Sequence, residues 1–250
     1  MRSIPIALII ISSIITCRAQ PHRFADYVEK TITSLADILP PVAGPDVQDA
    51  WRQTDALIAA YWSSGDGFDG NEGKEYTYGE VTGVGVRQLA YAMGVPSAED
   101  SSITFYDLGS GVARLVIQMV LDNPMAINKS VGVELSKERH DIASSALSRI
   151  RASDYSSDLL SKVELSNADA LKFDFRDATY IYISSLCFPR PVLEALQDII
   201  LALDYVKVVA ALNRLDKLEV SSDWGEGQDV PLQMTWGAGS AKIYRKRNGE

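Results

Sequence analysis

The chain has 250 residues, of which 46% are hydrophobic and 23% are charged, which suits one globular α/β domain with an added segment. Its formal net charge of −9 argues against a broad basic face for reading nucleic acid, because phosphate contacts need clustered Lys and Arg. An acidic surface is compatible with a basic protein substrate, and it is also a common route to solubility. The chain has only two Cys and two His, so we expect no disulfide framework and no metal site.

The first 19 residues resemble a secretory signal peptide. Arg2 precedes an apolar run over residues 4–17, and small residues precede a possible cleavage point after Ala19. The run is shorter than the roughly 20 residues that a membrane-spanning helix needs, so we expect no transmembrane span in the mature chain. Entry into the secretory pathway or an organelle is the prediction. An uncleaved anchor and an N-terminal core helix are the alternatives.

Residues 20–75 predict a helical cap in front of the main domain. Apolar side chains recur at helical spacing over residues 25–39, and a second helix is expected over residues 46–62. A loop rich in Gly and Asp follows at residues 63–73. The main domain then takes in residues 76–250.

In the main domain, strands and helices alternate after a first helix at residues 84–93. Strands are expected at 103–108, 131–135, 163–166, 180–184 and 205–212, with helices at 112–121, 137–150 and 191–203. This alternation predicts right-handed βαβ units and a mostly parallel sheet. Three further strands are expected at 218–221, 232–236 and 241–245, and the last two would form a hairpin. The predicted fold is α/β: a Rossmann-like, seven-stranded, mostly parallel sheet with a C-terminal antiparallel hairpin and an N-terminal helical cap.

A glycine-rich turn joins the first of these strands to its helix. Gly109 and Gly111 let the backbone bend and approach a ligand closely, at the sheet edge where α/β proteins bind ligands. A phosphate loop would need Gly-Lys-Ser/Thr, and a dinucleotide turn would need glycine where Leu115 stands. Asp107, just before the turn, would repel a pyrophosphate but suits a cationic amino acid. S-adenosylmethionine, with its ammonium and sulfonium, is therefore the expected cofactor.

Two more acids follow the next two strands. Glu134 ends the second strand, where a carboxylate can accept both ribose hydroxyls. Asp169 follows the third strand and is placed to accept from the adenine amino group. The alternative is that Glu134 caps the following helix and Asp169 is a solvated turn residue. Acids at three successive strand ends, with Gly-x-Gly at the first, favour the nucleoside site.

Four segments together resemble one family. Residues 107–112 (DLGSGV) resemble the turn of the disruptor-of-telomeric-silencing family, the histone-lysine methyltransferases that lack a SET domain. Residues 78–82 (YGEVT) resemble that family's segment over the cofactor, and residues 184–188 (SSLCF) fall where it has an Asn-Asn-Phe-Ala-Phe stretch lining the lysine channel. Residues 235–236 and Tyr244 resemble its closing hairpin. The chain departs from the family at Ala113, which replaces a glycine, and at Ser185, which replaces an Asn.

The resemblance implies a protein-lysine methyltransferase whose acceptor is a basic protein such as a histone. It implies cofactor contacts from Tyr78, Glu80 and Thr82, in addition to the strand-end residues. It also implies an acceptor channel that involves Ser185, Phe188 and Trp236. Such chemistry needs positioning and desolvation more than a general base. A small-molecule methyltransferase and a non-catalytic cofactor-binding module are the alternatives. The signal-like start favours a secretory or organellar enzyme over a nuclear one.

Overall fold

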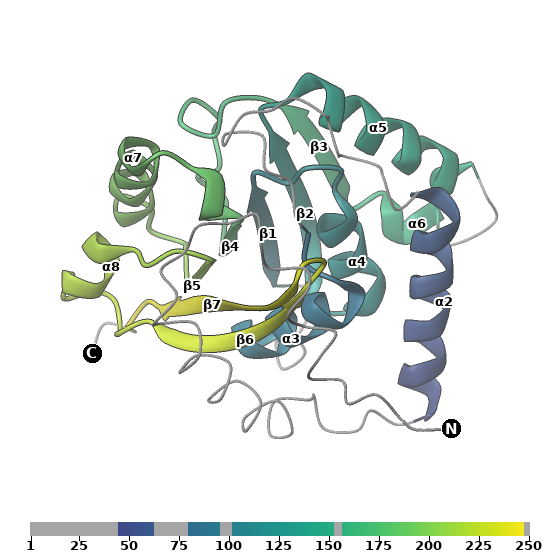
Figure 1. The fold of residues 1–250 in the computed structure, drawn as a ribbon, viewed down its shortest axis with the longest axis horizontal. Coiled ribbons are helices and arrows are strands. Elements are labelled where there is room, and N and C mark those ends of the chain that lie inside the picture. Colours follow the sequence, from purple (N-terminus) through teal and green to yellow (C-terminus); the bar gives the residue numbers. More distant parts are fainter. Residues whose placement is uncertain (1–44, 63–79, 96–101, 153–156, 248–250) are drawn as a thin grey trace, which may run out of the picture.

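The computed structural model describes residues 45–62, 80–95, 102–152 and 157–247 (Figure 1). The signal-like segment, the helix expected at 25–39, the loop at 63–73 and Tyr78 lie outside the described residues. The described elements in chain order are α2 (Pro45–Tyr61), α3 (Gly83–Met93), β1 (Ile103–Leu108), α4 (Arg114–Asp122), β2 (Ile127–Glu134), α5 (Lys137–Arg151), α6 (Ser157–Leu160), β3 (Val163–Asn167), β4 (Tyr180–Ile183), the 3-10 helix η4 (Ser185–Cys187), α7 (Arg190–Leu201), β5 (Val208–Ala211), α8 (Asp216–Val220), β6 (Gln228–Met234) and β7 (Gly237–Arg245).

The strands form one seven-stranded sheet in the order β3-β2-β1-β4-β5-β7-β6. The five strands from β3 to β5 run parallel, and β7 pairs antiparallel with both β5 and β6. The predicted mostly parallel sheet with a C-terminal hairpin at its edge is confirmed. Because the first five strands are parallel, their C-terminal ends meet at one edge of the sheet.

Helices cover both faces of the sheet (Figure 1). Helices α3, α4 and α5 bury apolar side chains against one face, and α7 and α8 bury theirs against the other. Helix α2 packs on α4 and α5, and next to it the Trp62 indole N–H donates to the carbonyl oxygen of Val112 at 3.1 Å. In the described part of the chain, no helix is long and apolar enough to cross a membrane.

The prediction of a strand at residues 218–221 is wrong, because residues 218–220 lie in α8 and Ser221 is its C-cap. Asp216 and Glu219 lie in the first turn of that helix, where carboxylates interact favourably with the helix dipole. Helical geometry buries Leu218 completely and leaves Val220 84% exposed. The remaining corrections are small. Strands β2, β6 and β7 each begin four residues earlier than expected. Helix α4 begins two residues later, β5 is shorter at both ends, and α6 and η4 are additional elements.

Candidate functional site

Two buried acids lie side by side at the C-terminal edge of the parallel strands. Asp107 of β1 is in register with Gly132 of β2, so Asp107 and Glu134 point to the same face, the one that carries α3 and α4. Asp107 is 3% exposed and Glu134 is 6% exposed. The two acids therefore share one side of the sheet.

The turn after β1 wraps around the end of β2. The amides of Gly109 and Ser110 donate to the carbonyl oxygen of Val133 at 2.8 and 3.1 Å. The Gly111 amide donates to Glu134 Oε2 at 2.7 Å, and the other oxygen of that carboxylate accepts from the Ser136 amide at 2.8 Å. Each carboxylate oxygen has two acceptor sites, so Glu134 can organise the turn and still accept from a ligand.

Asp107 has an unusual environment for a carboxyl group. Its Oδ1 atom is buried and makes no hydrogen bond with the described residues. Burial raises its pKa well above the usual value, and the nearby charges of Glu134 and Glu80 raise it further. No described His, Cys, Asp and Glu side chains form a group of three or more that could hold a metal ion. The arrangement instead suits an organic cation with hydrogen-bond donors, which would supply Asp107 with a partner.

Glu80 reaches this region from the segment that precedes α3. Its Oε2 pairs with Arg114 Nη1, at the start of α4, at 2.5 Å. The Glu80 backbone exchanges hydrogen bonds with Thr235 at the tip of the β6–β7 hairpin, at 3.1 Å to Thr235 Oγ1 and 2.8 Å from the Thr235 amide. Thr82 accepts from the Gly85 amide at 3.1 Å as the N-cap of α3 and donates to the carbonyl oxygen of Gln233 at 3.1 Å. Thr82 thus joins helix and hairpin, and its contact with a cofactor stays a prediction.

The three residues expected at the acceptor channel have different surroundings. Ser185 is fully buried, and its Oγ accepts from the Asn213 amide at 2.8 Å, which joins the end of β4 to the end of β5. The Phe188 ring lies against the glycine-rich turn, because a Cβ added at Gly109 would be 2.9 Å from Phe188 Cζ. Trp236 is 41% exposed at the hairpin tip, next to the residue that binds Glu80. Phe188 is the one of the three that is placed directly on the turn.

Asp169 lies in the loop after β3. Its Oδ1 accepts from the Leu171 amide at 3.0 Å, and its Oδ2 pairs with Lys172 at 3.2 Å. These two partners hold its pKa below the usual value. Its role toward adenine stays a prediction. Asn167, which the sequence did not single out, donates to the carbonyl oxygens of Glu134 and Leu135 at 2.9 and 3.0 Å and so fixes the neighbouring strand end.

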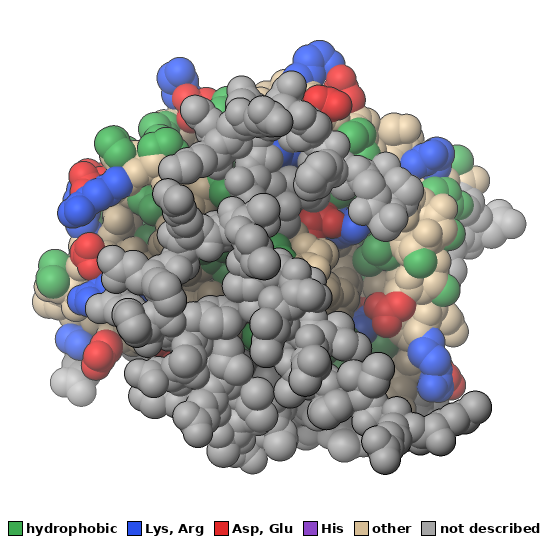
Figure 2. Space-filling view, viewed as in Figure 1, with side chains coloured by type: hydrophobic (Ala, Val, Ile, Leu, Met, Phe, Trp, Pro, Cys, Tyr) green, Lys and Arg blue, Asp and Glu red, His purple; other side chains and the backbone are tan. Residues whose placement is uncertain are grey.

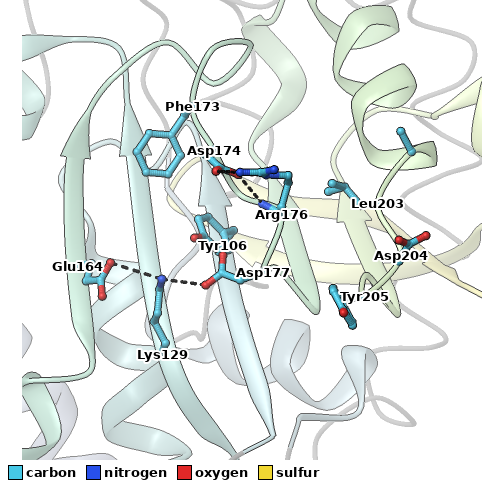
Figure 3. Close-up of a pocket in the computed structure, with 11 residues that line it drawn as sticks. Tyr106, Lys129, Glu164, Phe173, Asp174, Arg176, Asp177, Leu203, Asp204 and Tyr205 are labelled. Atoms are coloured by element: carbon cyan, nitrogen blue, oxygen red, sulfur yellow. Dashed lines mark hydrogen bonds and ion pairs between the residues drawn. The ribbon is translucent and has the colours of Figure 1, made fainter.

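A separate cleft of about 680 Å³ lies on the other face of the sheet (Figure 3). Several of its charges are paired with one another. Asp177 accepts from the Tyr106 hydroxyl at 2.7 Å and pairs with Lys129 at 2.9 Å, and Lys129 also approaches Glu164 at 3.5 Å. Charged side chains of both signs are spread over the described part of the face in Figure 2, with no single basic patch there. The strand-end group around Asp107 therefore remains the candidate site.

The strand order, the reversed seventh strand and the acid-flanked glycine turn define a class I S-adenosylmethionine-dependent methyltransferase. The family described as histone methylation protein DOT1 matches residues 70–216, more than half of the chain. The chain belongs to this family, the one whose motifs its sequence resembles.

Several solved structures are similar to this chain at low sequence identity. A putative RNA methyltransferase from Pyrococcus horikoshii is 13% identical with a TM-score of 0.51, over 79% of this chain and 98% of that one. An O-methyltransferase from Bacillus cereus in complex with S-adenosylhomocysteine is 13% identical with a TM-score of 0.49, over 86% and 96%. An RNA methyltransferase from Salinibacter ruber, also with S-adenosylhomocysteine, is 18% identical with a TM-score of 0.47, over 66% and 92%. No curated protein matches the chain in sequence.

Proposed function

We propose that this methyltransferase transfers a methyl group from S-adenosylmethionine to a lysine side chain of a basic protein, with a histone as the acceptor that its family suggests. The observation that carries the proposal is the buried Asp107 Oδ1 without a partner among the described residues, next to Glu134 and Glu80. Acceptor groups gathered in this way match a cofactor that carries two positive charges and several N–H and O–H donors.

The residues of the turn divide the work of holding the cofactor. Asp107 would accept from its ammonium group, and Glu134 would accept from the ribose hydroxyls while it keeps its bonds to the turn. The absence of a side chain at Gly109 leaves room for the Phe188 ring, which lies against the turn and would form a wall of the cofactor site. The bound cofactor supplies an electrophilic methyl group. The chain's own part is to orient the two reactants and exclude water.

The acceptor amine must lose its proton before it can attack the methyl group. Burial of a lysine among aromatic side chains lowers its pKa, and Phe188 and Trp236 are candidates for those walls. Ser185 is fully buried and engaged with Asn213, which supports a role in holding the channel segment in place. We therefore expect acceptor selection to depend more on the aromatic residues than on Ser185.

Incubation with a methyl-labelled cofactor tests the proposal. Purified protein should label core histones or nucleosomes, the label should be recovered on lysine, and Asp107→Asn should strongly reduce it at a cofactor concentration near the wild-type Kd. Labelling of a small-molecule extract in place of protein would overturn the lysine assignment and favour the small-molecule alternative. Binding of the cofactor without transfer to either acceptor would indicate a non-catalytic module.

The compartment is a separate proposal. We infer from the apolar run in residues 1–19 that the chain enters the secretory pathway or an organelle, with the nucleus as the alternative. A reporter protein fused after residue 30 should be exported or imported into an organelle with loss of the first 19 residues. A reporter that stays in the cytosol or nucleus with an intact N-terminus would contradict this inference.

A further inference from the structure

Tyr182 of β4 lies beside Asp107 in the sheet. The parallel register of β1 and β4 pairs Asp107 with Tyr182 directly. Paired residues of neighbouring strands point to the same face, so the tyrosine shares the face of α3 and α4 with the acid. Each of the two residues is the last but one of its strand. Both side chains therefore belong to the edge of the sheet where the cofactor is proposed to bind.

The Tyr182 hydroxyl is a second polar group without a partner. The residue is 1% exposed, and its hydroxyl oxygen is buried without a hydrogen bond to the described residues. A buried hydroxyl that makes no hydrogen bond costs free energy, and such groups are rare enough in native proteins to need an explanation. Burial raises its pKa, the neighbouring carboxyl of Asp107 raises it further, and the nearby Ser184 side chain, which is not within hydrogen-bonding geometry, lowers it. The net shift is upward, so the phenol keeps its proton and is available as a donor.

The groups around Asp107 can satisfy only part of an amino acid. Asp107, Glu134 and Glu80 offer acceptors, which suit an ammonium group but repel a carboxylate. Arg114, at the start of α4, pairs with Glu80 at 2.5 Å. A zwitterionic ligand needs a donor next to the acceptor. Tyr182 pairs with Asp107 on the same face, and the charge of the Asp107 carboxyl acts on its hydroxyl.

We propose that Tyr182 is a binding residue for the amino-acid end of the cofactor: its hydroxyl donates to the carboxylate while Asp107 accepts from the ammonium. This inference rests on the proposed cofactor site and adds to it a residue that the family motifs described above do not include. It also explains why a tyrosine hydroxyl is buried at this position, where phenylalanine would fill the same space.

Two ligands and two variants test the inference. S-adenosylhomocysteine carries the amino-acid end, and 5′-methylthioadenosine lacks it. Tyr182→Phe removes the hydroxyl. Tyr180→Phe is the matched control, because Tyr180 is on the same strand and face but pairs with Phe105, one pleat further from the edge.

Titration calorimetry with the full chain should show that Tyr182→Phe binds S-adenosylhomocysteine about tenfold to a hundredfold more weakly than the wild type. This is the size expected for one hydrogen bond to a charged group. Its affinity for 5′-methylthioadenosine should be unchanged, and Tyr180→Phe should match the wild type for both.

The outcomes separate this inference from the function it rests on. Equal affinity of Tyr182→Phe and wild type for S-adenosylhomocysteine would overturn the role of Tyr182 and leave the cofactor site intact. An equal loss for both ligands would also overturn it, because the effect would not lie at the amino-acid end. Failure of the wild type to bind S-adenosylhomocysteine would overturn the cofactor site itself. Thermal unfolding without ligand checks folding, and Tyr182→Phe should unfold at or above the wild-type temperature because it loses a hydroxyl without a partner.

Discussion

Two adjacent residues of β1, Tyr106 and Asp107, face opposite sides of the sheet and enter two different polar environments. On one side, the Tyr106 hydroxyl, Asp177 and Lys129 bind one another within the cleft of Figure 3. On the other side, the Asp107 carboxyl is buried without a partner among the described residues. The cleft has a volume of about 680 Å³, but the polar side chains of Tyr106, Lys129 and Asp177 in it already bind one another. Unsatisfied polar groups are therefore the better guide to the ligand site in this molecule.

The largest expected effect is on cofactor affinity at Asp107. Asp107→Asn keeps the shape of the side chain and removes the charge that would bind an ammonium group. We expect the affinity for S-adenosylhomocysteine to fall by about 1.5–3 kcal/mol, the size of one charge-assisted hydrogen bond. Titration calorimetry measures this loss, and Asp177→Asn in the cleft is the control with unchanged affinity. A loss of similar size in both variants would erase the distinction between the two regions.

Stability should respond in the opposite way. Asp177→Ala removes the partner of the buried Tyr106 hydroxyl and of Lys129. We expect it to lower the free energy of unfolding by about 1–3 kcal/mol, the cost of leaving a buried donor unsatisfied. Asp107→Asn should cost little or nothing without ligand, because it removes a buried acid that has no partner. Urea unfolding of the two variants measures the contrast. A larger loss of stability for Asp107→Asn would contradict it.

Part of this contrast could be predicted from the sequence. The strands can be predicted from short apolar runs. The glycine turn can be predicted because the first of these runs ends at an acid followed by two glycines. Both signals are local in the sequence. The prediction of a strand at residues 218–221 was wrong because four residues are too few to distinguish a strand from a helical turn. The sequence alone predicts only that Tyr182 lies in an apolar strand. Its importance depends on the register with β1, and neither this register nor the pair between Glu80 and Arg114 is encoded in a local pattern.

The pH dependence of stability should have opposite signs in the two regions. The pKa of Asp107 is raised above its reference value of 3.8 by burial and nearby charges, so the folded state holds its proton more tightly. Its contribution to stability therefore falls as the pH rises above about 3.8. For Asp177, burial raises the pKa, but the Tyr106 hydroxyl and Lys129 outweigh it and leave the pKa lowered. Its contribution is present above about 3.8 and is lost as the pH falls through the folded-state pKa.

Unfolding free energies of wild type, Asp107→Asn and Asp177→Asn between acidic and neutral pH measure these slopes. Each unit by which a pKa differs between the folded and unfolded states corresponds to about 1.4 kcal/mol. Asp107→Asn should gain stability relative to wild type as the pH rises, whereas the deficit of Asp177→Asn should shrink as the pH falls. Parallel curves for wild type and Asp107→Asn would show that the carboxyl is not perturbed. Cofactor binding should release a proton where Asp107 is protonated in the free protein, which buffers of different ionisation enthalpy detect.

The smallest expected effect distinguishes backbone strain at the turn from the packing of Phe188 against it. Gly109 has φ +87° and Gly94, at the end of α3, has φ +81°. Alanine at either position should therefore cost about 1 kcal/mol of stability through the left-handed backbone. A Cβ at Gly94 meets nothing within 4 Å, whereas one at Gly109 comes within 2.9 Å of the Phe188 ring. Gly109→Ala should thus also displace Phe188 and weaken S-adenosylhomocysteine binding, and Gly94→Ala should leave binding unchanged. Unfolding and calorimetry on the two variants decide this, and equal binding by both would mean that the position of the Phe188 ring does not affect the cofactor.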